Sequence, residues 1–508
     1  MGGPDMAPQT PQRSSRPGTA GALLGHRHPA AGALADALAA GRFCYVVELV
    51  ASGLTRESRV LDIASRLARV PDVVAGSVTS YAGGAMGQDP IRVGTAARAR
   101  GLAPNIHLTC ATQDRRTLDK TLEDLHALGL HDVFALTGDY PRGPDTPAPV
   151  FDLDAVQLVA LIAERRRGGM PFHVAVAVSP FKYVEADCRY QYLKLEKKIA
   201  AGADLAIGQV GWDARKLVEL KRYLDERGLR TPVLGNVYVL GPRAAARMAT
   251  GQPPGCWVSP ALLEIVREES RAPDGGLRAR LERAARMVAV LRGLGYAGAY
   301  LGGTHDAEQI QWIIRRADEL APRWESLADA LHFGRPDGFY LFGDDGRGQA
   351  DARRERASVS RWPPRVLDTL GKLFPVTRDT PLRRFLRRVF AWIDRRRALA
   401  KAVARVELAI KRPVFGCQEC GNCVLGHMEY VCPQTCPKQM RNGPCGGTDM
   451  GRCEVVDEPC IWVGVWQRAA AAGRVDDLRT YIPPPDRSLT GTSSWINYFL
   501  DRDRRPGR

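Results

Sequence analysis

The densest chemical feature of this 508-residue sequence is a group of eight cysteines near its C-terminal end. They are Cys417, Cys420, Cys423, Cys432, Cys436, Cys445, Cys453 and Cys460. Eight thiolates match two four-cysteine sites, and without a secretion signal a metal is favoured over disulfides. Three cysteines at successive spacings of three are typical of iron–sulfur loops, whereas zinc usually takes spaced pairs. The spacing predicts metal binding and leaves iron–sulfur and zinc both open.

Two carboxylates are also candidates for functional residues. Glu48 interrupts the apolar run Cys-Tyr-Val-Val-Glu-Leu-Val, and such surroundings should raise its pKa and suit a general acid near neutrality. The alternative is a buried structural glutamate paired with an arginine or lysine. Asp139 follows Gly138 at the end of another apolar run. Its alternative is a turn or helix-capping aspartate.

The elements that must position these residues alternate along the chain. The runs predicted as strands are residues 43–51, 73–81, 105–110, 133–137, 173–178, 205–209, 233–239 and 299–301. Helical patterns lie between them, for example at 57–68, 117–128, 187–201 and 214–227. Eight strands alternating with helices predict an α/β fold of the (β/α)₈ TIM-barrel type. A doubly wound open sheet is the alternative, weakened because no G-x-G-x-x-G follows a strand.

Polar residues end nearly every predicted strand, as a site for a polar ligand requires. Besides the two carboxylates they are Thr79, His107, Ser179, Gln209, Tyr238, Thr304 and His305. In a barrel the carboxyl ends of the strands carry the active site. Taken singly, His107 is more often a satisfied core histidine, and Gln209 can simply satisfy a strand end. The ordered set favours a common site.

The predicted barrel resembles the methylenetetrahydrofolate reductase family of flavoproteins. The resemblance covers residues 43 to about 320 and is carried by Glu48, Ser77-Val-Thr79, His107-Leu-Thr-Cys110, Leu136-Thr-Gly-Asp139 and the run from Lys198 to Gln209. It implies that Glu48 protonates the folate as its five-membered ring opens. It implies that Asp139 stabilises the resulting iminium cation and tunes the flavin, and that Gln209 contacts the pterin.

The same resemblance implies an FAD site. The positions that match it are Thr79, His107, Leu136, Gly138, Asp139, Phe151, Ala177 and Lys198. Lys198 would reach the flavin's pyrophosphate, and its alternative is a solvated helix lysine. The sequence departs from the family at Thr137, where an arginine is common beside the flavin. It also lacks the usual aromatic and proline residues after Glu48 and the adjacent phenylalanines after Gln209.

The cysteine block resembles the C-terminal domain found with these reductases. The resemblance rests on four segments: Cys-Gln-Glu-Cys-Gly-Asn-Cys, Cys-Pro-Gln-Thr-Cys-Pro-Lys, Asn-Gly-Pro-Cys-Gly-Gly and Pro-Cys-Ile-Trp. In some anaerobes this domain is a separate iron–sulfur subunit that feeds electrons to the flavin barrel. The resemblance thus adds an electron-transfer role to the predicted metal site and favours [4Fe–4S] clusters over zinc there.

The charge is concentrated between these two blocks. The net charge is +16, and residues 352–412 hold 18 Lys and Arg against 5 Asp and Glu. We therefore expect a disordered leader at 1–42, an FAD-binding barrel at 43–325, a linker and Arg-rich helical connector at 326–412, a small cysteine-rich metal-binding domain at 413–470 and a tail at 471–508. A basic connector suits docking of an acidic electron-carrier protein, or is simply a solvated face.

These observations predict a cytoplasmic, homo-oligomeric enzyme that reduces 5,10-methylenetetrahydrofolate to 5-methyltetrahydrofolate through FAD. Its partners would be the folate and either NAD(P)H or the acidic carrier, without nucleic acid or membrane. In one alternative, the enzyme catalyses the same step in the reverse direction and oxidises methyl-folate in a demethylation pathway. The other is a nucleic-acid-binding protein with a zinc domain, which the near-neutral barrel and the scarcity of interleaved aromatics disfavour.

Overall fold

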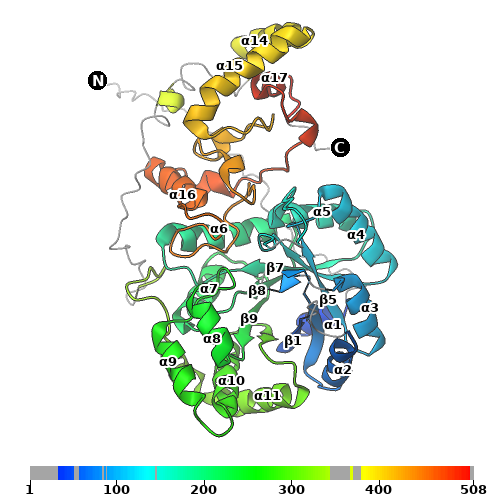
Figure 1. The fold of residues 1–508 in the computed structure, drawn as a ribbon, viewed down its shortest axis with the longest axis vertical. Coiled ribbons are helices and arrows are strands. Elements are labelled where there is room, and N and C mark those ends of the chain that lie inside the picture. Colours follow the sequence, from blue (N-terminus) through cyan, green and yellow to red (C-terminus); the bar gives the residue numbers. More distant parts are fainter. Residues whose placement is uncertain are drawn as a thin grey trace, which may run out of the picture.

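A closed barrel of parallel strands forms the larger part of the protein (Figure 1). The computed structural model describes residues 32–50, 57–79, 81–82, 85–86, 88–142, 146–343, 366–369 and 379–503. Within this part, eight strands close in the order β1-β10-β9-β8-β7-β6-β5-β2. They are β1 (Cys44–Leu49), β2 (Val73–Val78), β5 (Pro104–Thr109), β6 (Asp132–Leu136), β7 (His173–Val178), β8 (Leu205–Gly208), β9 (Val233–Tyr238) and β10 (Gly298–Gly302). The predicted TIM barrel is confirmed.

Helices surround the barrel and bury its outer face. They are α2 (Glu57–Leu67), α3 (Pro90–Ala99), α4 (Arg115–Ala127), α5 (Ala155–Arg167), α6 (Glu185–Ala201), α7 (Ala214–Glu226), α8 (Pro242–Ala249), α9 (Pro260–Glu269), α10 (Leu277–Gly293), α11 (Ala307–Leu320) and α12 (Trp324–Asp329). A short hairpin of β3 (Tyr81–Ala82) and β4 (Ala85–Met86) follows β2. Since both strand faces are buried, the strands read as nearly continuous apolar runs.

The structure differs from the predicted leader at residues 33–39. These form helix α1 (Ala33–Ala39), whose Leu34 and Ala37 are fully buried with residues that line the barrel interior. The apolar side chains of α1 cover one end of that interior, which explains why an Ala-rich segment becomes ordered. Residues 1–31 of the predicted leader lie outside the described residues.

The C-terminal part is built from helices and cysteine-bearing loops. Its main helices are α14 (Pro381–Asp394), α15 (Arg397–Phe415), α16 (Ile461–Ala472) and α17 (Ser494–Phe499). Figure 1 shows α17, from the predicted tail, beside α14 and α15, from the predicted connector. Arg383 joins them by donating to Asp501 at 2.9 Å and to the Tyr498 hydroxyl at 3.0 Å. Over the described residues, no helix combines the length and hydropathy that a membrane span requires.

The C-terminal part packs against the barrel along one helix, α6. Tyr190 and Leu193 of α6 share an apolar cluster with Trp462 and Trp466 of α16. The Tyr190 and Trp462 rings meet edge to face with their centres 5.2 Å apart. Helix α6 is therefore covered by the barrel on one side and by the cysteine-bearing part on the other (Figure 1).

Candidate functional site

The two-residue alternation of the strands brings the predicted site residues to one end of the barrel interior. In β1, Val46 belongs to the interior cluster and Val47 to the outer core, so Glu48 faces inward. The same phase applies to the other strands. Five further predicted residues face inward for this reason, in the carboxyl-terminal half of a strand or just beyond it: Thr79, His107, Leu136, Ala177 and Gln209. The barrel brings these sequence-predicted residues around one opening, called here the barrel mouth.

Glu48 lies deep in this mouth. Its Oε2 would be 3.1 Å from a Cβ added to Gly302 on the neighbouring strand, so the carboxyl packs against bare backbone. Burial raises its pKa to about 7. No described lysine or arginine forms an ion pair with it, so within those residues the structural alternative finds no partner. A carboxyl of this pKa holds or gives a proton near neutrality.

Asp139 lies beyond β6 on another side of the mouth. Gly138 precedes it with φ of +87°, and a Cβ there would come within 2.9 Å of Ala111. The turn that presents Asp139 therefore requires glycine. Burial raises the pKa of Asp139, opposed by the positive charge of Lys438 and reinforced by Glu454. Neither of these two neighbours belongs to the barrel.

His107 is an uncharged polar group of the interior. Its Nε2 lies 2.9 Å from the Ser77 hydroxyl oxygen, and its ring meets Phe134 edge to face at 4.9 Å. Burial lowers its pKa to about 3. It is therefore neutral at physiological pH and offers hydrogen bonds without charge.

Gln209 and Lys198 occupy the β7–β8 side. Gln209 directs Oε1 to the Val210 N–H at 2.9 Å, and its Nε2 would lie 3.5 Å from a Cβ added to Gly255. The Lys198 ammonium is buried and donates to the Ala177 carbonyl at 2.6 Å, and burial lowers its pKa to about 7. Lys198 is thus not the solvated helix lysine of the alternative reading.

The remaining predicted cofactor residues line the same region. Thr79 is buried, with its hydroxyl 3.4 Å from the Leu49 carbonyl oxygen. Phe151 has φ of +45° and stacks on Tyr140 with ring centres 5.9 Å apart. Thr137, the departure from the family, accepts from the Ala155 N–H at 3.3 Å and so serves the start of α5.

The C-terminal part completes the mouth, which sequence reasoning missed. Lys438 and Glu454 form a buried ion pair there, and Lys438 donates to the Gly138 carbonyl at 2.8 Å. A cavity of about 170 Å³ lies between the two parts, lined by Cys256 and Trp257 of the barrel and by Glu454, among others. Lys438 sits in an ordinary Cys-Pro-Lys run, so no pattern in the sequence points to this contact.

The eight cysteines fall into two groups. The first thiol group consists of Cys417, Cys420, Cys423 and Cys432. Burial raises the pKa of Cys432 to about 11, and the other three add to the rise, so they lie near it. The second thiol group consists of Cys436, Cys445, Cys453 and Cys460. Burial likewise raises the pKa of Cys445 to about 12, with contributions from Glu454 and Cys436.

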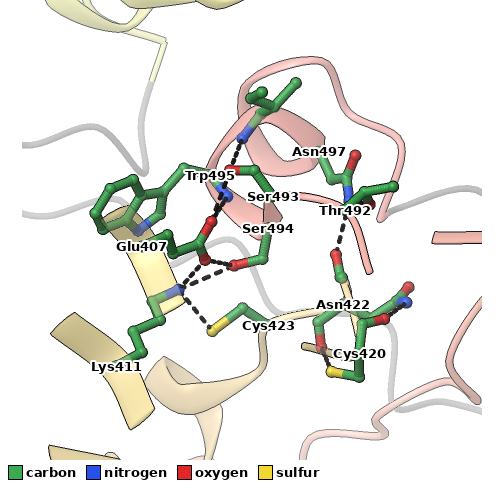
Figure 2. A network of polar contacts seen from close by, with 12 residues as sticks. Glu407, Lys411, Cys420, Asn422, Cys423, Thr492, Ser493, Ser494, Trp495 and Asn497 are labelled. Carbon is green, nitrogen blue, oxygen red and sulfur yellow. Dashed lines mark hydrogen bonds and ion pairs between the residues drawn. The ribbon is translucent and has the colours of Figure 1, made fainter. Parts of the chain in front are cut away.

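The first thiol group lines a pocket beneath α15. Figure 2 shows two of its members, Cys420 and Cys423, beside the polar network at this pocket. Lys411 of α15 points its ammonium to the Cys423 sulfur at 3.5 Å, to Glu407 at 2.7 Å and to the Ser494 hydroxyl at 2.9 Å. The Cys420 sulfur faces away from this network, toward the Asn422 carbonyl at 3.6 Å.

No group of three or more His, Cys, Asp or Glu side chains in the described part of the chain is arranged to hold a metal ion. The chemistry of the donors nevertheless fits one, because four thiols line one pocket and four more cluster beside the barrel mouth. The predicted metal sites stay predictions.

Comparison with known proteins gives two family matches. Residues 33–251 match the model described as methylenetetrahydrofolate reductase, and residues 397–488 match the one described as its C-terminal domain. Methylenetetrahydrofolate reductase 2 of Saccharomyces cerevisiae is 26% identical over 161 residues, 30% of this chain and 26% of that protein. Methylenetetrahydrofolate reductase (NADH) 1 of Arabidopsis thaliana is 31% identical over 144 residues, 26% of this chain and 24% of that protein.

The chain thus spans about a quarter of the length of these curated relatives. A solved structure of an uncharacterised Clostridium thermocellum protein, described as binding two copies of 5-methyl-5,6,7,8-tetrahydrofolic acid, has a TM-score of 0.39 at 10% identity. It covers 57% of this chain and 99% of its own, and the low score leaves it without weight here. The two matches, in order along a barrel and a cysteine-bearing C-terminal part, show that this chain carries a methylenetetrahydrofolate reductase family domain followed by the C-terminal domain of that family.

Proposed function

We propose that the protein reduces 5,10-methylenetetrahydrofolate to 5-methyltetrahydrofolate with FAD as its cofactor. The observation that carries this proposal is the pair of buried carboxyls, Glu48 and Asp139, at the same barrel mouth. Both pKa values are raised by burial, and both charges reach Cys256, whose own pKa burial raises to about 12. The two carboxyls therefore both lie within electrostatic reach of the same buried thiol.

The two carboxyls suit the two charge changes of this reaction. Glu48 would give its proton to the folate nitrogen that is released when the five-membered ring opens, leaving an iminium cation. Asp139, ionised, would stabilise that cation across the mouth. Gln209 has an amide with which to orient the pterin. The proton stays on the released nitrogen, and one hydride added to the methylene carbon gives the methyl product.

The mouth also fits a flavin, on the evidence of polar atoms left without partners. Among the described residues, Ser179 Oγ, Asn236 Oδ1 and His305 Nε2 are buried and make no hydrogen bond. Buried polar atoms are nearly always satisfied, so these three favour a polar ligand. Thr79, His107, Leu136, Gly138, Asp139, Phe151, Ala177 and Lys198 would hold FAD. The bound flavin would supply the hydride.

The proposal is tested on the purified full-length protein. We expect the absorption bands of a bound oxidised flavin and the formation of methyl-folate from methylene-folate and a reductant. Protein that neither carries nor takes up FAD would refute the proposal. The same assay started from 5-methyltetrahydrofolate and an oxidant measures the reverse reaction, and faster oxidation under matched conditions would favour the demethylation alternative.

The electron donor is the second part of the proposal. We propose that the two thiol groups hold metal, iron–sulfur in preference to zinc, and that the basic helices α14 and α15 dock an acidic electron carrier. Metal analysis after anaerobic purification separates iron from zinc. Comparing NADH, NADPH and a reduced acidic carrier as donors identifies the electron source. Carrier-driven activity should fall with added salt, because exposed charges are screened.

A further inference from the structure

One buried ion pair of the C-terminal part lies inside the barrel mouth. Lys438 and Glu454 are 3% and 4% exposed. The Lys438 ammonium donates to the Gly138 carbonyl at 2.8 Å and lies 5.7 Å from the centre of the Phe151 ring. Gly138 and Phe151 both belong to the proposed flavin site. The function proposed above uses neither member of the pair.

Contacts on both sides fix the segment that carries Lys438. The carboxylate of Asp154, at the start of α5, accepts from the backbone N–H groups of Arg441 and Asn442 at 3.2 and 2.9 Å. Lys194 of α6 donates to the carbonyls of Gly443 and Pro444 at 3.2 and 2.9 Å. The chain just after Lys438 is thus held to two barrel helices.

The position of Glu454 is equally constrained. A Cβ on Gly447 would fall inside the Glu454 carboxyl group, so only glycine leaves room for it. The Cys445 sulfur lies 3.2 Å from Glu454 Oε1. Glu454 therefore contacts both the second thiol group and Lys438. Lys438 in turn contacts the barrel.

Stability alone gives a weak reason to bury this pair. The cost of dehydrating two buried charges commonly cancels their attraction, so apolar residues would hold the domains together as well. Docking is already provided by Asp154, Lys194 and the apolar contacts of α6. A fixed charge in a dry site does have a strong effect on charges that appear beside it.

We propose that Lys438 is an electrostatic component of the barrel's flavin site, supplied by the cysteine-rich part, and that Glu454 moderates its charge. This inference rests on the proposed function. Reduction adds negative charge to a flavin, so a nearby ammonium favours the reduced state and a nearby carboxylate opposes it. The pair then sets how readily the flavin accepts electrons.

The test uses opposite charge changes in the full-length protein. Lys438→Met removes the cation and should lower the midpoint potential of the bound flavin, whereas Glu454→Gln removes the anion and should raise it. Lys438→Arg keeps the charge and should stay near wild type. Binding of FAD to flavin-depleted protein, followed by fluorescence, should weaken for Lys438→Met and be largely restored for Lys438→Arg.

Lys197→Met is the matched control. Lys197 is also a buried lysine of this interface and its ammonium donates to the Leu478 carbonyl at 3.2 Å, across the interface. It directly precedes Lys198, but among the described residues its own side chain makes no hydrogen bond to a proposed flavin residue. It should lose stability without shifting the potential. Potentials that move in the same direction for Lys438→Met and Glu454→Gln, or not at all, would overturn the inference while flavin binding and turnover uphold the proposed function. Metal content is measured in each variant, because Glu454 contacts Cys445.

Discussion

The two sides of the barrel mouth are built in different ways. The β1 side, which presents Glu48, consists of barrel strands alone, since β1 pairs with β10 and β2. The β6 side, which presents Asp139, is completed by Lys438 and Glu454 from a segment about three hundred residues later. Burial is the cause of the raised pKa of Glu48, whereas charges from both parts also act on Asp139.

This difference suggests a division of labour. The side proposed to donate a proton depends only on strand geometry, which a barrel fixes strongly. The side proposed to stabilise charge is formed jointly and would respond to the state of the cysteine-bearing part. Variants on each side should therefore differ in size and in kind of effect.

The largest effect is expected for Glu48→Gln. Glutamine fills nearly the same space but has no proton to give, so folate reduction should fall by about 10²–10⁴-fold. Single-turnover reduction of methylene-folate by the pre-reduced enzyme measures it. FAD binding should persist as the control, and turnover near wild type would contradict the acid role.

The pH dependence follows from the same residue. Since burial raises the pKa of Glu48 to about 7, its acid form is lost as pH rises through this value and folate reduction should fall with it. The raised pKa also means that the folded state loses stability between the ordinary carboxyl pKa and about 7. Glu48→Gln should therefore gain melting temperature relative to wild type at about pH 8 and not at about pH 4.

A smaller loss is expected for Asp139→Asn on the joint side. Asparagine keeps the shape but removes the charge that would stabilise the iminium cation, so folate reduction should fall by about 10²-fold. Removing a negative charge should also raise the flavin's midpoint potential, which Glu48→Gln should leave almost unchanged. Equal potentials in the two variants would break the proposed division of roles.

The joint side also depends on Asp154. Asp154→Ala removes the N-cap of α5 and the acceptor for two backbone N–H groups of the C-terminal part, and should cost about 2–4 kcal/mol in denaturant unfolding. Asp114 caps α4 by accepting from the Thr117 N–H, a bond within the barrel, so Asp114→Ala should cost only about 1 kcal/mol. Equal losses would mean that the interface contacts contribute nothing.

The smallest effect is expected where the two parts touch backbone to backbone. Gly255 has φ of +79°, and a Cβ there would lie 2.8 Å from the Gly446 carbonyl oxygen. Gly251 has φ of +76° and open space around it. Both alanine variants should lose about 1 kcal/mol from backbone strain. Only Gly255→Ala should also lower folate reduction several-fold, and equal kinetics would show that the contact does not shape the mouth.

Much of the barrel's own part of the mouth was accessible to prediction because it depends on local pattern. Alternation along the strands places Glu48, Thr79, His107 and Gln209 inward, and the eight predicted strands agree with the observed ones to within a few residues. The joint side was not accessible, because Lys438 and Glu454 act through long-range contacts that leave no periodic trace. The same limit applies to α1, where tertiary burial of Leu34 and Ala37 orders a segment of leader-like composition.

The burial of α6 between the two parts has a consequence for synthesis of the chain. Lys194 is synthesised long before the segment that covers it, since Gly443, whose carbonyl accepts its hydrogen bond, lies 249 residues further along the chain. At about 5–20 residues per second, roughly 12–50 seconds separate the two on the ribosome. During that time Tyr190 and Leu193 offer an uncovered apolar face, so the nascent barrel should need protection that the finished protein does not.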